Sequence, residues 1–169
     1  MSSKHLKGIV LVGAMCAITT VWAEEGGNTP ALAKAISGAS ITLQQGLAAS
    51  ADQGRPISAK YEIDEGTFQL SVYTEKASKF SEVVVDHTTG KVAKSEAITR
   101  GDDLRKAKAQ SKAMANVKGT LQSVVDKGEH DSPGFRAVSV EPKLKAGHAI
   151  AAVTLVKGNQ FKSVAEPLE

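Results

Sequence analysis

The chain has 169 residues, of which 41% are hydrophobic, 23% are charged and only 4% are aromatic, with a formal net charge of +3. These values are ordinary for one folded domain or two small ones, and they exclude collagen-like, fibrous and wholly disordered proteins. The charge is also too small to indicate a nucleic-acid-binding protein, and the scarcity of aromatic residues predicts a core of aliphatic side chains and alanine.

The first 23 residues have the pattern of a secretory signal peptide. Lys4 and Lys7 give a positively charged start, residues 9–22 carry no charge, and Ala23 precedes two glutamates. We therefore expect cleavage after Ala23 and a mature protein that is periplasmic or secreted. A buried N-terminal helix is the alternative interpretation. A membrane span is disfavoured because the uncharged run is shorter than the roughly 20 residues that a bilayer needs.

Removal of this segment excludes some kinds of catalysis and metal binding from the mature chain. The formal net charge falls from +3 to +1, and the single cysteine, Cys16, is lost. A mature chain without cysteine forms no disulfide and offers no thiolate for catalysis or metal binding. Lipidation of Cys16 is an alternative, although Met15 fits poorly before a lipid-modified cysteine.

The rest of the chain contains a weak internal repeat. Segment 34–44 aligns with 112–122 at an offset of 78 residues, and segment 66–83 aligns with 147–164 at an offset of 81, each with five identities. The change of offset falls between the helical and strand regions, where loops tolerate insertions. Because repeats set the architecture of a chain, we predict two units, residues 24–99 and 103–169.

The first unit is predicted to begin with helices and to continue with strands. Thr29 and Pro30 can start a short helix, and Thr42 with Gln45 forms the pattern of a capping box for the next one. Apolar and polar residues then alternate along two segments, which indicates a half-buried antiparallel sheet. Two further strands follow; the four predicted strands cover residues 57–63, 68–73, 80–85 and 92–98.

The second unit repeats this order. Residues 104–117 are rich in alanine and lysine and favour a helix, and residues 120–127 continue or restart it. Strands are predicted near 138–140, 149–156 and 161–165. We therefore predict an α+β fold in which each unit packs an N-terminal helix on an antiparallel sheet of three to four strands. Whether the two sheets join is open at this point.

A turn motif adds a resemblance to a known family. The sequence Val85-Asp86-His87-Thr88-Thr89-Gly90-Lys91-Val92 follows the third predicted strand. Asp86 can accept hydrogen bonds from backbone N–H groups of the turn, and Gly90 can supply a positive φ; with Thr89 they are the predicted structural residues of the turn. With the helix and strands before it, this turn resembles the PepSY domain over residues 41–97, and the same pattern is typical of that family.

The second unit lacks the turn motif, because the sequence ends at Glu169 where the turn would begin. We regard it as PepSY-like and more divergent. The resemblance implies an exported, non-enzymatic protein that binds or restrains a partner, a peptidase being one candidate. The tandem layout also resembles periplasmic β-lactamase-inhibitor proteins. Neither resemblance implies a catalytic residue or a cofactor.

An exposed sheet face is the predicted site of partner binding. By alternation, Tyr73 lies opposite the apolar face of its strand, where an aromatic side chain can anchor a partner. Packing of Tyr73 against a helix or the other unit is the alternative. Gln69 and Ser71 share its face, and Ile150 and Ala152 are the corresponding candidates in the second unit.

Other chemistry has weaker signals. Glu129-His130-Asp131 is the best metal-like cluster, but adjacent residues in an extended loop point in different directions, so His130 is only a weak candidate ligand. No histidine lies beside a glycine-framed serine, which disfavours a hydrolase. Export and the lack of stacking aromatics disfavour nucleic acid. A small-ligand or metal sensor that uses a crevice between the units is the alternative function.

Overall fold

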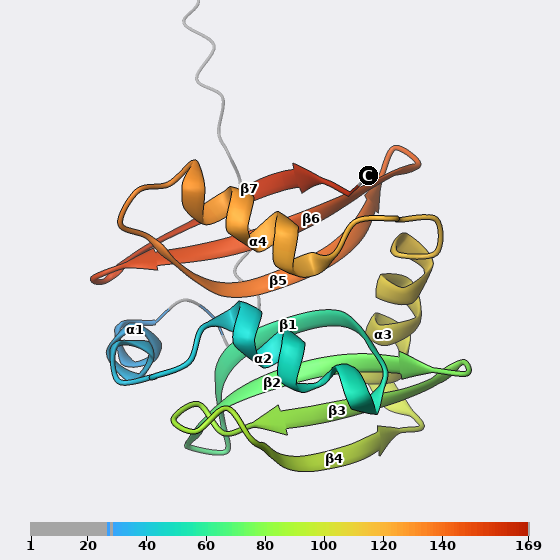
Figure 1. Cartoon of the computed structure of the whole chain (residues 1–169), viewed down its shortest axis with the longest axis horizontal. Helices are drawn as coiled ribbons and strands as arrows, with labels where there is room; N and C mark the ends of the chain where they lie inside the picture. The colour runs from blue at the N-terminus through green and yellow to red at the C-terminus, as the bar shows by residue number, and fades with distance from the viewer. Residues whose placement is uncertain (1–26, 28, 169) are drawn as a thin grey trace, which may run out of the picture.

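The structure is a computed structural model that describes residues 27 and 29–168 (Figure 1). The predicted signal peptide, its cleavage point after Ala23 and Cys16 lie outside these residues. The first half contains α1 (Pro30–Ser37), α2 (Leu43–Ala49), the 3-10 turn η1 (Ala51–Gln53), β1 (Arg55–Asp64), β2 (Thr67–Lys76), β3 (Lys79–Val85) and β4 (Val92–Ile98). The second half contains α3 (Gly101–Ala113), α4 (Leu121–His130), β5 (Arg136–Lys145), β6 (His148–Lys157) and β7 (Gln160–Pro167).

The fold is α+β, as predicted, but its strands form one sheet. The order of the seven antiparallel strands is β4-β3-β2-β1-β5-β6-β7. The sequence left open whether the strands of the two units join, and the structure shows that they form one continuous sheet. The two halves join where β1 pairs with β5, through Ala59 opposite Val140 and Lys60 opposite Ser139. This pairing satisfies strand edges that would otherwise be exposed in each half.

The predicted helix starts are confirmed by their caps. The Thr29 hydroxyl accepts a hydrogen bond from the backbone N–H of Leu32 at 3.2 Å, with Pro30 in the first turn of α1. Thr42 and Gln45 form the expected capping box of α2, in which the Gln45 side chain accepts from the Thr42 N–H at 2.8 Å. These contacts satisfy N–H groups that the first turn of a helix leaves unpaired.

Helix α3 differs from its predicted bounds of 104–117. It begins at Gly101, where Asp102 and Asp103 stabilise the first turn through their negative charge. It ends at Ala113, and the guanidinium of Arg55 from β1 donates to the carbonyl oxygen of the following residue, Met114, at 3.1 Å. Helix propensity could not predict that α3 ends at Ala113, because the capping side chain, Arg55, comes from a strand and lies 59 residues away in the sequence.

The helices divide between the two faces of the sheet. The main core joins α1, α2 and α4 to side chains such as Leu70, Val72 and Val83. A smaller cluster joins α3 to the other face through Ile57, Phe80 and Ala107. Figure 1 shows α2 and α4 side by side over the sheet and α3 at one end of the strands. One face is therefore well covered, and the other is covered only in part.

Candidate partner-binding face

The partly covered face carries all five residues predicted to bind a partner, in two groups. Gln69, Ser71 and Tyr73 lie on β2, whereas Ile150 and Ala152 lie on β6. Strands β1 and β5 run between them. At the usual strand separation the groups are about 14 Å apart, so they belong to one surface but do not form one cluster.

Tyr73 is a packing residue. Its half-buried ring packs with the α3 cluster of Ile57, Phe80 and Ala107, and the ammonium of Lys60 lies 5.7 Å from the ring centre. Burial raises the pKa of the Tyr73 hydroxyl well above its usual value, so the side chain stays neutral. The expectation that Tyr73 anchors a partner is therefore replaced by its alternative, packing against a helix.

Ser71 and Gln69 also contribute less exposed surface than alternation suggested. Ser71 is fully buried, and its hydroxyl accepts a hydrogen bond from the Gln69 side-chain amide at 2.9 Å. Gln69 is half-buried. Strand alternation does not report how far a position is buried. Of the five predicted residues, Gln69, Ile150 and Ala152 are half-buried and belong to neither core cluster of the described residues.

Lys60 provides the charge at the centre of this face. Its ammonium pairs with the Glu62 carboxylate at 2.6 Å. Burial alone would lower the pKa of Lys60, but Tyr73 and the hydrogen bond that Lys60 donates to Glu62 raise the pKa above its usual range. Lys60 is thus a fixed cation held between an acid and an aromatic ring.

Small uncharged side chains form much of the surface over β6 and β7. Ser139, opposite Lys60, is followed across the sheet by Thr154 and then Ser163, as the strand registers show. In the next row Ala152 lies opposite Ala165. Ile150 and Ala152 are half-buried and belong to neither core cluster of the described residues. This region over β6 and β7, defined here as the open face, has no covering helix in the described chain. Glu141 and Lys143 of β5 adjoin it, opposite Ala152 and Ile150.

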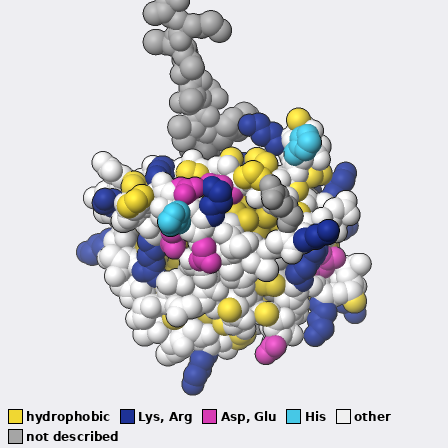
Figure 2. All heavy atoms as spheres, turned by 45° about the horizontal axis from the view of Figure 1, so that its top comes forward, with side chains coloured by type: hydrophobic (Ala, Val, Ile, Leu, Met, Phe, Trp, Pro, Cys, Tyr) yellow, Lys and Arg dark blue, Asp and Glu magenta, His cyan; other side chains and the backbone are white. Residues whose placement is uncertain are grey.

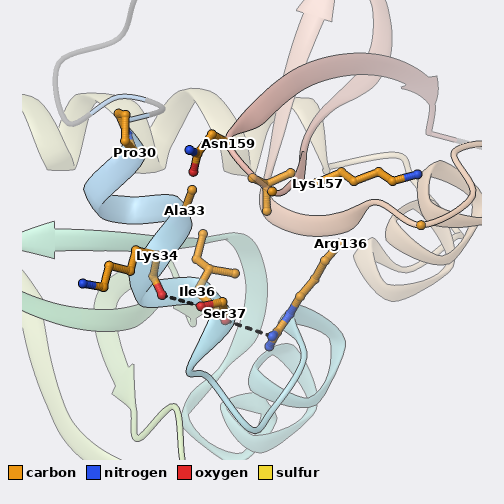
Figure 3. Close-up of a pocket in the computed structure, with 11 residues that line it drawn as sticks. Pro30, Ala33, Lys34, Ile36, Ser37, Arg136, Lys157 and Asn159 are labelled. Atoms are coloured by element: carbon orange, nitrogen blue, oxygen red, sulfur yellow. Dashed lines mark hydrogen bonds between the residues drawn. The ribbon is translucent and has the colours of Figure 1, made fainter.

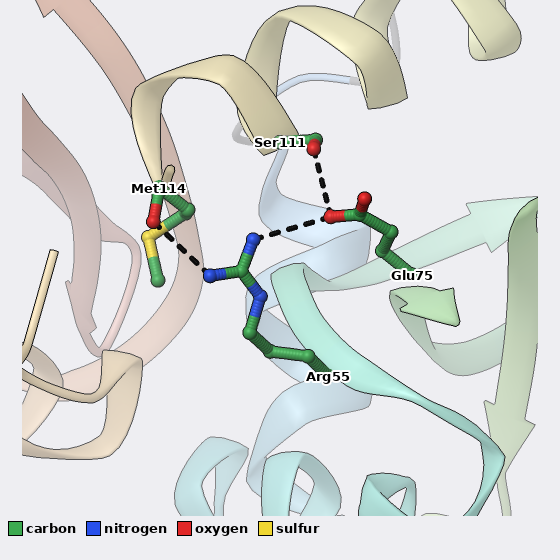
Figure 4. Close-up of polar contacts among 4 residues, drawn as sticks. All are labelled: Arg55, Glu75, Ser111 and Met114. Carbon is green, nitrogen blue, oxygen red and sulfur yellow. Dashed lines mark hydrogen bonds and ion pairs between the residues drawn. The ribbon is translucent and has the colours of Figure 1, made fainter. Parts of the chain in front are cut away.

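Helix α3 borders the open face and is fixed by a polar contact set (Figure 4). The Glu75 carboxylate accepts hydrogen bonds from the Ser111 hydroxyl at 2.7 Å and from the Arg55 guanidinium at 3.1 Å. Arg55 also caps Met114, as described above. A third bond joins the Ser58 hydroxyl to the Gln110 side chain at 2.8 Å. These contacts hold α3 on the sheet, so it is a fixed border of the open face.

The Asp86 turn has the geometry expected from its sequence. One carboxylate oxygen of Asp86 accepts hydrogen bonds from the N–H groups of Thr88 at 2.9 Å and Thr89 at 2.7 Å, and from the Thr89 hydroxyl at 3.0 Å. These bonds lower the pKa of Asp86. Gly90 adopts a φ of 73°, as expected. The hydrogen bonds of Asp86 and Thr89 and the φ of Gly90 have the geometry that the sequence predicts for this turn.

The turn also positions the helical layer. The carbonyl oxygen of His87 accepts hydrogen bonds from the N–H groups of Ser40 and Ile41, in the loop between α1 and α2. The imidazole of His87 lies 4.7 Å from the ring of Phe68. The turn therefore connects the end of β3 to the helices, a role that the sequence did not reveal.

Arg136 connects the second half to the same loop, and sequence reasoning missed it. Its guanidinium donates to the carbonyl oxygens of Ile36 at 3.1 Å and Ala39 at 3.0 Å, and to that of Ile41. The Tyr61 hydroxyl donates to the same Ile41 oxygen at 2.7 Å. Arg136 thus satisfies carbonyl groups at the end of α1 from the first strand of the other half.

A pocket of about 570 Å³ lies beside Arg136, between the two halves (Figure 3). It is lined by α1, by the start of β5 and by the turn between β6 and β7. Lys34 and Lys157 lie at its edge. His130 does not line it, and the Arg136 guanidinium is already bonded to three carbonyl groups. The crevice expected for a sensor exists. Its polar lining comprises Lys34, Ser37, Lys157, Asn159 and Arg136, whose buried Nε has no hydrogen-bond partner among the described residues.

In the candidate metal cluster Glu129-His130-Asp131, the two carboxylates bind other residues of the chain. Glu129 and His130 lie in the last turn of α4 and not in the extended loop that we expected. The Glu129 carboxylate accepts from the Ala137 N–H at 2.7 Å and from the Gln44 side chain at 2.9 Å, while Asp131 pairs with Lys127 at 2.6 Å. The described residues contain no group of three or more potential metal ligands. His130 is exposed.

Charges elsewhere are mixed in sign. Lys127 on α4 contacts both Asp131 at 2.6 Å and Glu166 on β7 at 3.0 Å. The face in Figure 2 shows basic and acidic side chains interspersed among small hydrophobic areas. Within residues 27 and 29–168, the helices are all too short or too polar to cross a membrane.

Comparisons with known proteins give little further information. No protein-family model and no curated protein matches the chain. A solved structure described as a candidate lipoprotein of Clostridium difficile 630 is 13% identical, with a TM-score of 0.41, over 68% of this chain and 75% of that one. Similarity at this level supports no inference about function.

Proposed function

We propose that the mature chain is an exported protein-binding module without catalytic activity, built from two PepSY-like repeats. It acts by covering part of a partner protein in the periplasm or outside the cell. A peptidase is the partner class that the PepSY resemblance suggests. The observation that carries the proposal is the open face, which the fold leaves without a covering helix in the described chain.

The order of elements supports the repeat. In the first half α2 is followed by β1, β2 and β3, and in the second half α4 is followed by β5, β6 and β7. Thr42 and Thr120 cap α2 and α4 in the same way, through N–H groups three residues later. Thr42 and Thr120 are also identities of the sequence alignment at the offset of 78 residues.

The composition of the open face suits binding by shape. Alanine, serine and threonine side chains lose little conformational freedom on burial, and their small size allows close approach of a partner. Ile150 offers apolar area next to them. Lys60, held by Glu62, marks the border of the surface and can provide orientation through charge.

Substitution of Ala152 tests this function. Arginine at this position places a long cation on the open face without a change in the main core. We expect Ala152→Arg to reduce capture of the partner from envelope extract at least tenfold, and to abolish any inhibition of a captured peptidase. Ala48→Arg on the exposed side of α2 is the matched control and retains capture. Equal capture by both variants contradicts the proposal.

A further inference from the structure

The outer edge of the first half contains a strand with an unusual symmetry of sequence. Strand β4 reads Val92-Ala93-Lys94-Ser95-Glu96-Ala97-Ile98. About Ser95 the residue types mirror each other: alanine matches alanine, valine matches isoleucine, and lysine matches glutamate. Two copies of this strand, run antiparallel about Ser95, would therefore face each other with complementary side chains at every position.

The structure leaves this edge accessible. Strand β4 pairs with β3 on one side, and within the described chain no strand pairs with its other side. Six of its seven residues are exposed and Ile98 is half-buried, so neither face of the strand is covered. Backbone N–H and C=O groups along such an edge are available to another strand.

We propose that β4 is a dimerisation edge at which a second copy of this chain pairs antiparallel through its own β4, in the register that places Ser95 opposite Ser95. Lys94 then lies opposite Glu96 of the second copy, and Glu96 opposite Lys94 of the second copy. The two sheets become one continuous sheet with a two-fold axis through its centre, which is the symmetric arrangement that most soluble dimers adopt.

The charges on and beside β4 are the strongest argument that a second copy of the chain pairs at this edge. On its inner side Glu96 lies opposite Glu82 of β3, and like charges in directly opposed positions are unfavourable. Lys94 of the same strand balances Glu96 at 2.9 Å, but both side chains are about 60% exposed. Lys94 of a second copy places another cation beside the acidic pair. Val92, which is 38% exposed, is covered by Ile98 of the second copy.

The opposite edge is a less suitable partner. Strand β7 contains Pro167, which has no N–H to donate. Its acid Glu166 is buried and bound to Lys127 at 3.0 Å, and the ammonium of Lys162 lies over the ring of Phe135 at 4.3 Å. Lys162 and Glu166 contact groups on other elements, whereas Lys94 and Glu96 pair within their own strand and are both about 60% exposed.

A cysteine at the centre of β4 tests the register. Directly opposed residues of antiparallel strands have Cα atoms 4.5–5.5 Å apart, within the range that a disulfide spans. In a Cys16→Ser background, we expect Ser95→Cys to form a disulfide-linked dimer on mild oxidation. Ser163→Cys, at an exposed site on β7, is the matched control and stays monomeric. Cross-linking at Ser163 in place of Ser95 overturns the proposal.

Charge reversal tests the complementarity. In analytical ultracentrifugation over a range of concentrations, we expect a reversible monomer–dimer equilibrium whose dissociation constant rises about tenfold in Lys94→Glu. The double variant Lys94→Glu/Glu96→Lys exchanges the charges and restores the equilibrium. Lys143→Glu, an exposed reversal on β5, leaves it unchanged. A chain that is monomeric throughout, or a double variant as weak as the single one, overturns the proposal; circular dichroism checks that each variant is folded.

The dimer and the open face are independent. The two-fold axis is perpendicular to the sheet, so the open faces of both copies point to the same side and the binding surface is doubled. Loss of the dimer in Lys94→Glu leaves each open face intact. Partner capture by a monomeric variant therefore separates a failure of this proposal from a failure of the proposed function.

Discussion

The guanidinium of Arg136 donates to the carbonyl oxygen of Ile36 at 3.1 Å, although the two residues are 100 positions apart in the chain. Ile36 lies near the C-terminal end of α1, where carbonyl groups have no partner within the helix. A cation at this end also interacts favourably with the helix dipole. Through this contact the second half of the chain holds the first helix of the first half in place.

Removal of the Arg136 guanidinium is expected to lower the free energy of unfolding. In Arg136→Ala the carbonyl groups of Ile36, Ala39 and Ile41 lose charged hydrogen bonds, and we expect a loss of about 2–4 kcal/mol in the free energy of unfolding. Arg136→Lys keeps the charge but not the planar fork, so its loss is smaller. Chemical denaturation measures both. Arg105→Ala, an exposed arginine on α3, is the control, and an equal effect there would contradict this role of Arg136.

Two buried glycines in helices are expected to respond in opposite ways to alanine. In α2, a Cβ atom at Gly46 would lie 2.3 Å from Cδ2 of the fully buried Leu70, so Gly46→Ala overpacks the core and costs about 1–3 kcal/mol. In α4, a Cβ atom at Gly128 would lie 3.4 Å from Val153, an ordinary contact. Gly128→Ala therefore stabilises by about 0.5–1 kcal/mol through helix propensity. Thermal unfolding of both variants checks the sign of each change.

Asp86 makes the free energy of unfolding depend on pH under acidic conditions. Hydrogen bonds from Thr89 and Thr88 lower the pKa of Asp86 in the folded protein below its usual value of 3.8. Its contribution to stability is therefore fully present above the unfolded-state pKa and is lost as the pH falls through the folded-state pKa. We expect Asp86→Asn to keep the turn through its amide oxygen and to remove this part of the acid dependence. An unchanged slope below pH 4 in the variant would argue against the assignment.

The two tyrosines of the chain are expected to ionise at a higher pH than free tyrosine. Burial raises the pKa of both Tyr61 and Tyr73 above the usual value of 10.0, although the neighbouring cations Arg136 and Lys60 oppose the shift. Their contribution to stability is present below pH 10 and is lost as the pH rises further. Ultraviolet absorbance of tyrosinate should show no titration centred near pH 10 in the folded protein, and normal titration after unfolding. A folded-state transition at pH 10 would contradict the burial of that ring.

Local sequence signals predicted much of the fold. Caps at Thr29 and Thr42, alternation along β1 and β2, and the Asp86 turn depend on residues within a few positions of each other, so the sequence contains the whole interaction. The pairing of Ala59 with Val140 is not visible in this way, because the two strands have no distinguishing pattern at the seam. The single continuous sheet could therefore be recognised only from the structure.

The same reasoning explains which site residues were misjudged. Alternation places Tyr73 and Ser71 on the correct face, but it does not report what covers that face. The coverage of Tyr73 comes from α3, which crosses the sheet because distant groups such as Arg55 and Ser58 bind it. Ile150 and Ala152 are outside this coverage, and their position on the open face agrees with the prediction from alternation.

The most direct test of the account is site-specific photo-cross-linking on the open face in living cells. A photoreactive amino acid at Ile150 should give one discrete adduct whose mass identifies a different protein, whereas the same residue at the exposed Ala48 of α2 should give none. Adducts at Ala48 together with no adduct at Ile150 would contradict the claim that the open face is the binding surface.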